Sequence, residues 1–299
     1  MPQGIILKGV GSFYEVLRQE DPYTLYTCKV RGINRKKGIT PLPGDRVTFD
    51  ILNESDHEGH IDQVLERRNS FVRPTVANID QLAIVMAVNS PSPDLMLVDK
   101  LLITCLAKEI QPLIVINKAD LDQENRMEGL MSAYKETGFT IIGLSKFQPE
   151  GYELLHRKLV GHTTAFAGQS GVGKSTILNA ILDHWLMETG DVSDRIQRGK
   201  HTTRHVQLFR LDRGGFILDT PGFSSFSISD VTHDTLKEYY PEFNSASGSC
   251  RFNSCSHTGE PDCAVNALLS EGRLDEGRYN RYIELYKELK EAYDNRYRR

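Results

Sequence analysis

The chain has 299 residues, of which 39% are hydrophobic and 25% charged, so it can bury a substantial core, and its length favours two or three domains. Its formal net charge of −4 argues against a protein that coats nucleic acid indiscriminately, because phosphate binding needs clustered Lys and Arg. The N-terminal residues lack a basic start followed by a long apolar run, and no stretch reaches the roughly 18 apolar residues of a spanning helix. We therefore expect a cytoplasmic protein with no membrane partner.

Residues 1–68 are predicted to form a small all-β domain, either a barrel or a sandwich. Short runs rich in β-branched and aromatic residues, at 13–17, 25–30 and 47–52, are separated by Gly and Pro. The segment 28–46 carries six basic residues against a single acid. On a small barrel such a face is either an RNA-binding surface or simply a solvated one.

Residues 69–228 are predicted to form an α/β domain. Continuous apolar runs at 82–88 and 113–116, separated by a helix-length segment at 94–109, are typical of buried parallel strands. Further strands are expected at 140–143, 164–167 and 216–218. The last two are each followed by a motif at the carboxyl end, where open α/β sheets bind their ligands.

The first of these motifs is a complete phosphate-binding P-loop that opens the predicted helix 176–182. Its glycines let the backbone wrap phosphates, Lys174 can reach the β and γ phosphates in binding and catalysis, and Ser175 would place its hydroxyl on Mg²⁺. The predicted phosphate-binding residues are Gly168, Gln169, Ser170, Gly171, Val172, Gly173, Lys174, Ser175 and Thr176.

A second motif, Asn117-Lys118-Ala119-Asp120, is predicted to select GTP over ATP. The Asp120 carboxylate can accept from the ring N–H and the exocyclic amine of guanine, a donor pair that adenine lacks. Asn117 would touch the base edge and bind back to the P-loop, while the stem of Lys118 covers the ring face. Ser145 and Lys146, after the predicted strand 140–143, offer a weaker second contact to the base.

The sequence between the P-loop and residue 222 supplies two candidate switches. Asp219-Thr220-Pro221-Gly222 offers a carboxylate that can hold Mg²⁺ through water and a Gly222 N–H that faces the γ phosphate. The segment 198–205 is positioned to be the first switch, and Thr203 is our choice for its magnesium ligand.

Phe223 stands where many GTPases carry the glutamine that orients the attacking water. An apolar side chain cannot do this, so we expect slow intrinsic hydrolysis that depends on another group or on a partner. His201 is the nearest candidate, although among its basic neighbours it can equally contact phosphate. The predicted catalytic residues are His201, Lys174, Thr203, Asp219 and Gly222.

The motifs occur in an unusual order, with the guanine element first, then the P-loop, the first switch and the Asp-x-x-Gly element. This order is a circular permutation, which an α/β domain with neighbouring termini can accommodate. As a consequence the second switch runs directly into the C-terminal region, so loss of the γ phosphate could be transmitted there mechanically.

Residues 229–299 are predicted to form a helical zinc-binding domain. Three thiols and an imidazole occur in a turn-rich stretch, and a Cys₃His set suits a closed, structural zinc site. The predicted ligands are Cys250, Cys255, His257 and Cys263. Helices are expected at 264–270 and 278–297, and the tyrosine stripe on the second is either core or a nucleic-acid stacking surface.

The permuted order, the Gly199–Thr203 segment and the Cys-x4-Cys-x-His-x5-Cys cluster together resemble the RsgA (YjeQ/YloQ) family of small ribosomal subunit biogenesis GTPases. The resemblance implies an OB-fold, a permuted GTPase domain and a zinc domain. It implies binding to the small (30S) subunit and its 16S rRNA, and hydrolysis of GTP to GDP and phosphate that the subunit stimulates before release. In this family the position of His201 is proposed to replace the missing glutamine.

Two other functions stay open at this point. The protein could be a GTP-gated binding module whose turnover is incidental, or a metabolic NTPase unrelated to ribosomes. We expect a monomer with one structural zinc, and with magnesium bound alongside GTP.

Overall fold

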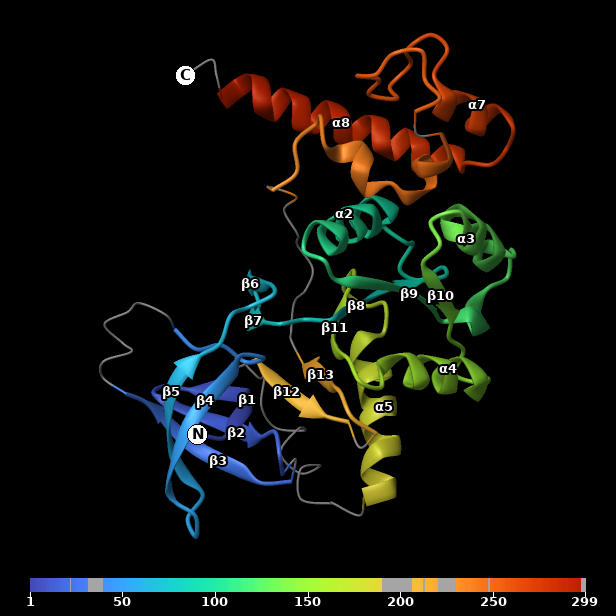
Figure 1. Cartoon of the computed structure of the whole chain (residues 1–299). Coiled ribbons are helices and arrows are strands. Elements are labelled where there is room, and N and C mark those ends of the chain that lie inside the picture. Colours follow the sequence, from blue (N-terminus) through green and yellow to red (C-terminus); the bar gives the residue numbers. More distant parts are fainter. Residues whose placement is uncertain are drawn as a thin grey trace. The chain divides into compact units, whose positions relative to one another are not determined.

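The computed structural model describes residues 1–21, 23–31, 40–189, 206–211, 213–219, 228, 230–246 and 248–296, and of residues 183–189, 219 and 296 only the backbone. The chain folds into two units (Figure 1). The first comprises 1–82, 154–166 and 175–223, and the second comprises 83–153, 167–174 and 224–299.

Five strands near the N-terminus close into a barrel. They are β1 (Gln3–Val10), β2 (Phe13–Arg18), β3 (Leu25–Val30), β4 (Arg46–Asn53) and β5 (Glu58–Val64). β1 pairs antiparallel with β2 and β4, β2 with β3, and β4 with β5, while parallel pairing of β3 with β5 completes the ring. This is the OB-fold arrangement, so the barrel alternative is confirmed and the sandwich was wrong.

The barrel core explains which strands the sequence pattern revealed. Alternating residues of β2, β3 and β4 point inward, including Val16, Tyr26 and Phe49, and these three strands were predicted. β1 and β5 were missed because their glycines and polar residues dilute the alternation. The Cys28 thiol lies in this core, where burial raises its pKa to about 12 and leaves it inert at neutral pH.

The rest of the first unit extends this sheet. β11 (Thr163–Ala167) pairs parallel with β13 (Phe216–Asp219), as expected for an α/β domain. β12 (Gln207–Arg210) lies antiparallel to β13 and meets β1 at Lys8 and Gln207. β6 (Ser70–Val72) and β7 (Thr75–Ala77) form a separate hairpin.

The second unit contains the other buried strands. β8 (Gln81–Ala87), β9 (Gln111–Asn117) and β10 (Thr140–Gly143) lie in the order β10-β9-β8, and β9 and β10 pair parallel. β8 is buried throughout, which accounts for its unbroken apolar sequence. The helical elements that accompany these strands are α2 (Leu95–Ala107), η1 (Ala119–Leu121), α3 (Arg126–Lys135) and the start of α4 (Pro149–Leu159), whose residues 154–159 belong to the first unit.

The C-terminal part of the second unit is helical, as predicted. It contains η2 (Leu236–Tyr239), η3 (Pro241–Ala246), α7 (Ala264–Ser270) and α8 (Glu276–Arg296). In the tyrosine stripe of α8, Tyr279 and Tyr282 are buried and Tyr286 packs beside them, whereas Tyr293 is 41% exposed. Most of the stripe is therefore core, and this structural role excludes its buried rings from stacking on nucleic acid.

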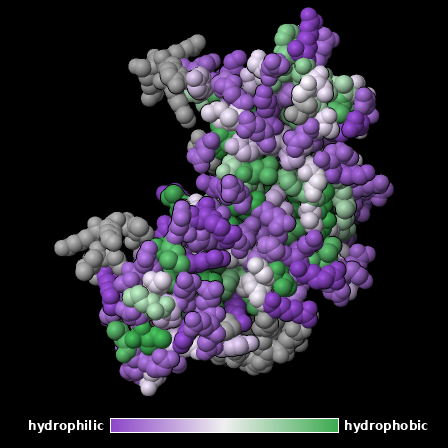
Figure 2. All heavy atoms as spheres, in the orientation of Figure 1, coloured by the Kyte–Doolittle hydropathy of each residue, from purple (hydrophilic) through white to green (hydrophobic). Residues whose placement is uncertain are grey.

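On the face drawn in Figure 2, hydrophilic side chains predominate and hydrophobic ones form smaller patches. Among the helices of the described residues, none is both long and apolar enough to cross a membrane.

Candidate nucleotide site and metal cluster

The P-loop follows β11 directly and leads into α5 (Lys174–Thr189). Gly168 has φ +137°, and a Cβ there would lie 2.0 Å from the Val85 carbonyl oxygen. Gly173 has φ +98°, and a Cβ there would lie 2.3 Å from Nδ2 of Asn117. Only glycine fits these two positions, because both backbone angle and space exclude a side chain. The loop is thereby folded closely against β8 and the end of β9.

Lys174 turns back over the loop. Its Nζ donates to the carbonyl oxygens of Gly168 at 2.7 Å and Gln169 at 2.8 Å. Burial lowers the pKa of the Lys174 ammonium, so a nearby phosphate charge would stabilise its charged form. Ser175 and Thr176 are exposed in the first turn of α5.

The guanine motif is attached to the P-loop by two consecutive side chains. Asn117, at the end of β9, is 7% exposed, and its Nδ2 donates to the Val172 carbonyl at 2.8 Å. Lys118 has φ +62°, and its Nζ donates to the carbonyl oxygens of Gly171 at 2.8 Å and Ser90 at 2.5 Å. The bond from Asn117 back to the loop is as predicted, whereas no pattern in the sequence indicated Ser90.

Asp120 lies in η1 and faces Lys146. The Lys146 ammonium is 3.2 Å from Oδ2 of Asp120, whose side chain is only 7% exposed, and the Lys146 N–H lies 3.4 Å from Oδ1. Burial alone would raise the pKa of Asp120, but its hydrogen bonds and ion pair with Lys146 outweigh burial and lower it. At neutral pH Asp120 is thus an ionised acceptor, and Ser145 begins the turn that brings Lys146 to it.

The predicted switch residues are described only in part. β13 ends at Asp219, whose backbone is described. Three residues expected to act in hydrolysis lie outside the described residues: His201, Thr203 and Gly222. Phe223 also lies outside them, so these roles stay predictions.

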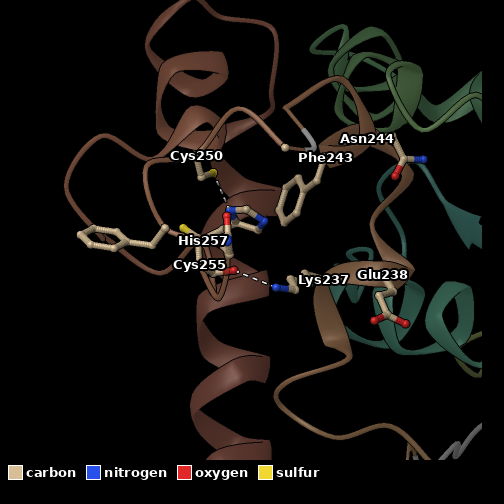
Figure 3. A pocket seen from close by; sticks show the side chains of 10 residues that line it. Lys237, Glu238, Phe243, Asn244, Cys250, Cys255 and His257 are labelled. Atoms are coloured by element: carbon tan, nitrogen blue, oxygen red, sulfur yellow. Dashed lines mark hydrogen bonds between the residues drawn. The ribbon is translucent and has the colours of Figure 1, made fainter.

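The four predicted metal ligands converge in the C-terminal region. Figure 3 labels Cys250, Cys255 and His257 among them. Their donor atoms all lie within 4.8 Å of one another, and Nδ1 of His257 is 3.6 Å from Sγ of Cys250 and 3.4 Å from Sγ of Cys263. In a tetrahedron with Zn–S near 2.3 Å and Zn–N near 2.0–2.1 Å, the S···N edge is about 3.6 Å. The cluster is therefore compatible with a structural metal ion.

The surroundings of the cluster suit metal ligation. Burial raises the pKa of the Cys255 thiol to about 12, so a metal must displace its proton. Burial, and then the charge of Lys237, lowers the pKa of His257 and favours the neutral imidazole that can ligate. The Ala264 N–H, at the start of α7, donates to Sγ of Cys250 at 3.3 Å. Metal affinity is consequently expected to fall as the pH falls.

A buried ion cluster joins α2 to α8. The Asp99 carboxylate accepts from Nη1 of Arg278 at 2.7 Å, Nε of Arg281 at 2.6 Å and the Tyr134 hydroxyl at 2.8 Å. Arg278 also pairs with Glu242 of η3. Sequence reasoning missed this cluster, although the lone carboxylate in the apolar sequence of α2 was an available signal.

A P-loop tied to a guanine-type motif that precedes it in the chain defines a class, the circularly permuted P-loop GTPases. The sequence patterns of two domains, described as RsgA GTPase and RsgA N-terminal domain, match residues 64–229 and 3–61. The chain belongs to the RsgA family of GTPases.

Curated relatives agree over nearly the full length. A protein of Ruminiclostridium cellulolyticum, named small ribosomal subunit biogenesis GTPase RsgA, is 52% identical over 97% of this chain and 95% of its own. A protein of the same name from Alkaliphilus metalliredigens is 43% identical over 97% of this chain and 98% of its own.

Two solved structures have the same fold. The crystal structure of YloQ, a circularly permuted GTPase, superposes with a TM-score of 0.81 at 35% identity, covering 98% of this chain and 96% of that one. YjeQ from Thermotoga maritima also gives 0.81, at 32% identity, covering 96% and 98%. The predicted fold class, a permuted GTPase domain with a barrel before it and a helical metal-binding region after it, is confirmed.

Proposed function

We propose that this GTPase acts in late maturation of the small (30S) ribosomal subunit, is stimulated by that subunit, and leaves it after hydrolysing GTP to GDP and phosphate. The observation that carries the nucleotide part is the double attachment of the guanine motif to the P-loop, by Asn117 to Val172 and by Lys118 to Gly171. The names of the two curated relatives support the ribosomal part.

The proposed roles follow the geometry. Asp120 reads guanine while Asn117 and Lys118 hold the base against the P-loop, and Ser145 and Lys146 flank the base. The loop from Gly168 to Thr176 binds the phosphates through its backbone N–H groups and Lys174. These residues hold the base and the phosphates in fixed positions relative to each other. Positioning of the reacting groups is a main contribution that a protein makes to phosphoryl transfer.

We assign magnesium to Ser175 and Thr203, with Asp219 acting through water and the Gly222 N–H facing the γ phosphate. When bound, magnesium neutralises charge on the β and γ phosphates. We assign the Cys₃His cluster to one structural zinc ion, since three thiolates and an imidazole favour zinc among the common divalent metals.

The barrel is the proposed RNA-binding domain, 1–68, followed by the GTPase domain at 69–228 and the zinc domain at 229–299. Phe13 is 48% exposed and pairs in register with Lys29, whose Nζ lies 4.8 Å from the ring centroid. Tyr23 is 84% exposed, with the guanidinium of Arg210 4.7 Å from its ring centroid. Exposed rings beside cations suit stacking on unpaired bases of 16S rRNA.

One basic side chain of the segment 28–46 pairs with carboxylates of the barrel itself. Arg31 forms ion pairs with Asp50 and Asp62, which leaves its charge partly neutralised. Residues 32–39 lie outside the described residues, so the contribution of this segment to RNA binding stays a prediction. We further propose that the protein acts as a monomer in the cytoplasm.

GTP turnover is expected to rise at least about tenfold when purified small ribosomal subunits are added, because partner-completed GTPase sites gain up to about 10³–10⁵-fold. Phosphate release by the full chain, measured with and without subunits, tests this. Large subunits and ATP are the controls, and Lys174→Ala should abolish the signal. Turnover unaffected by small subunits would overturn the stimulated mechanism.

His201→Ala is expected to slow subunit-stimulated turnover by about 10²-fold or more, the usual contribution of a general acid–base or water-orienting group. Its affinity for GDP should not change, because the assigned base and phosphate contacts do not include His201. Sedimentation with subunits should then find the variant bound long after wild type has dissociated. Dissociation at the wild-type rate would favour the binding module whose turnover is incidental.

A further inference from the structure

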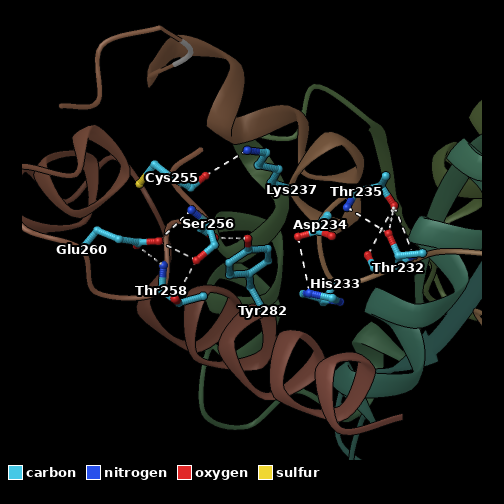
Figure 4. Close-up of polar contacts among 10 residues, drawn as sticks. All are labelled: Thr232, His233, Asp234, Thr235, Lys237, Cys255, Ser256, Thr258, Glu260 and Tyr282. Atoms are coloured by element: carbon cyan, nitrogen blue, oxygen red, sulfur yellow. Dashed lines mark hydrogen bonds and ion pairs between the residues drawn. The ribbon is translucent and has the colours of Figure 1, made fainter. Parts of the chain in front are cut away.

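The backbone of the metal-binding loop is held by three side chains from outside it. Nζ of Lys237 donates to the Cys255 carbonyl at 2.9 Å, and the Tyr282 hydroxyl donates to the Ser256 carbonyl at 2.5 Å. The Tyr279 hydroxyl donates to the His257 carbonyl at 2.9 Å. Three consecutive carbonyl groups, two of them belonging to metal ligands, are thus each fixed by a separate donor. Figure 4 shows the bonds from Lys237 and Tyr282.

The other side of the loop is held by Glu260. Its carboxylate accepts from the N–H of Ser256 at 2.7 Å, from the hydroxyl of Ser256 at 2.5 Å and from the N–H of Thr258 at 2.8 Å (Figure 4). Burial alone would raise the pKa of Glu260, but these hydrogen bonds outweigh it and lower the pKa to about 2, so the carboxylate remains an acceptor at neutral pH. Side chains therefore fix both the donors and the acceptors of this irregular segment.

The donors themselves have fixed positions. Tyr282 is fully buried, with its ring centroid 4.9 Å from that of Tyr240 and 5.0 Å from that of Phe243. Tyr279 is 8% exposed, and its hydroxyl also contacts Oδ1 of Asn266 at 2.8 Å. Both tyrosines lie on α8, which Asp99 of α2 anchors through Arg278 and Arg281. Packing in the core thus positions the two hydroxyl groups.

We propose that Lys237, Tyr279 and Tyr282 are positioning residues that hold residues 255–257 in the metal-ligating conformation, so that the affinity for zinc depends on them. The inference rests on the proposed structural zinc. A loop ordered in advance loses less conformational freedom on binding, which raises affinity without any added ligand. Lys237 also places a positive charge beside a site whose three thiolates and one Zn²⁺ sum to a net negative charge.

The test titrates the metal-free full chain with Co²⁺, whose visible absorption reports tetrahedral thiolate coordination, and measures Zn²⁺ affinity by competition with a chromogenic chelator. Tyr282→Phe and Tyr279→Phe each remove one hydroxyl and keep the ring. We expect each to weaken metal binding by about 10-fold, and the pair together by up to about 100-fold, as outer-shell changes commonly do. Lys237→Met should weaken it at least as much as either.

Tyr286→Phe is the matched control, because it makes the same chemical change one turn further along α8, where the ring packs against His233 at 5.6 Å instead of reaching the loop. Its metal affinity should equal that of wild type. GDP affinity, measured in parallel, should be unchanged in all variants, which separates loss of positioning from unfolding.

Wild-type affinity and an unchanged Co²⁺ spectrum in the Tyr279→Phe, Tyr282→Phe double variant would overturn the inference. Loss of GDP binding together with metal binding would also overturn it, since the residues would then be supporting the whole unit. Failure of the wild-type chain to bind one zinc would instead overturn the zinc assignment itself, so the two failures are distinguishable.

Discussion

Replacing Asp120 by asparagine is expected to move the nucleotide preference from GTP to XTP. The Asp120 carboxylate offers two acceptors to the ring N–H and the exocyclic amine of guanine. Asparagine keeps one acceptor for the ring N–H, but its amide N–H₂ faces the position of the exocyclic group. In guanine this group is an amine, which is also a donor, whereas in xanthine it is a carbonyl, which can accept from the amide. Sites that read a base through paired hydrogen bonds reject the wrong partner by about 10⁴–10⁵-fold, so GTP affinity should fall on that scale.

Competition binding with GDP, XDP and ADP measures this switch. Asp120 is only 7% exposed and its carboxylate pairs with Lys146, so the substitution also breaks this ion pair, and some loss of affinity for every base is expected. Asp122→Asn is the control. The Asp122 carboxylate accepts from the N–H groups of Arg126 and Met127, each at 3.0 Å, at the start of α3, so its loss should not alter base preference. A continued preference for GTP in the Asp120 variant would mean that another group reads the base.

Asp99→Ala is expected to destabilise the second unit by about 3–5 kcal/mol, the usual effect of removing one partner from a buried ion pair. Arg278 is 1% exposed and, among the described residues, would keep Glu242 as its one ionic partner, while Arg281 would lose its bond to the carboxylate. The Tyr134 hydroxyl would lose its acceptor as well. Urea unfolding, followed by the near-ultraviolet circular dichroism of tyrosine, measures the change.

Glu288→Ala provides a control between the same two helices. Glu288 pairs with Lys100 of α2 at 2.9 Å, but its side chain is 56% exposed. Water screens such a pair, so its removal should change stability by no more than about 1 kcal/mol. If Asp99→Ala cost no more than Glu288→Ala, the buried cluster would not be what fastens α8 to α2.

The Asp99 cluster also gives α2 a role in connecting the two sites. Ser90, whose carbonyl accepts from Nζ of Lys118, lies a few residues before α2 begins. Asp99, within α2, holds the helix whose tyrosines contact the metal-binding loop. The guanine motif, the P-loop as far as Lys174 and the metal cluster all belong to the second unit of the fold.

The class of this protein, a circularly permuted GTPase with a cysteine-rich metal cluster, could be predicted from short contiguous segments of its sequence. The P-loop, the Asn117–Asp120 motif and the cysteine cluster each place their functional groups within a few consecutive residues, so local spacing was enough to indicate their chemistry. The unbroken apolar sequences of β8 and β9 were equally clear, because strands buried on both faces need apolar residues at every position. The unusual order of the motifs, also visible in the sequence, identified the permutation.

Only the tertiary structure decided how these segments support one another. β5 became a strand by completing a ring with β3 and β4, although its own sequence alternates poorly. Arg278 finds Asp99 179 positions away, and the Tyr282 hydroxyl meets Ser256 across 26. The helical spacing of the tyrosines predicts a buried face but says nothing about where their hydroxyl groups end. Such contacts depend on the packing of elements that are distant along the chain. A buried polar group without a hydrogen bond is unfavourable, so each one pairs with a partner that the fold places nearby.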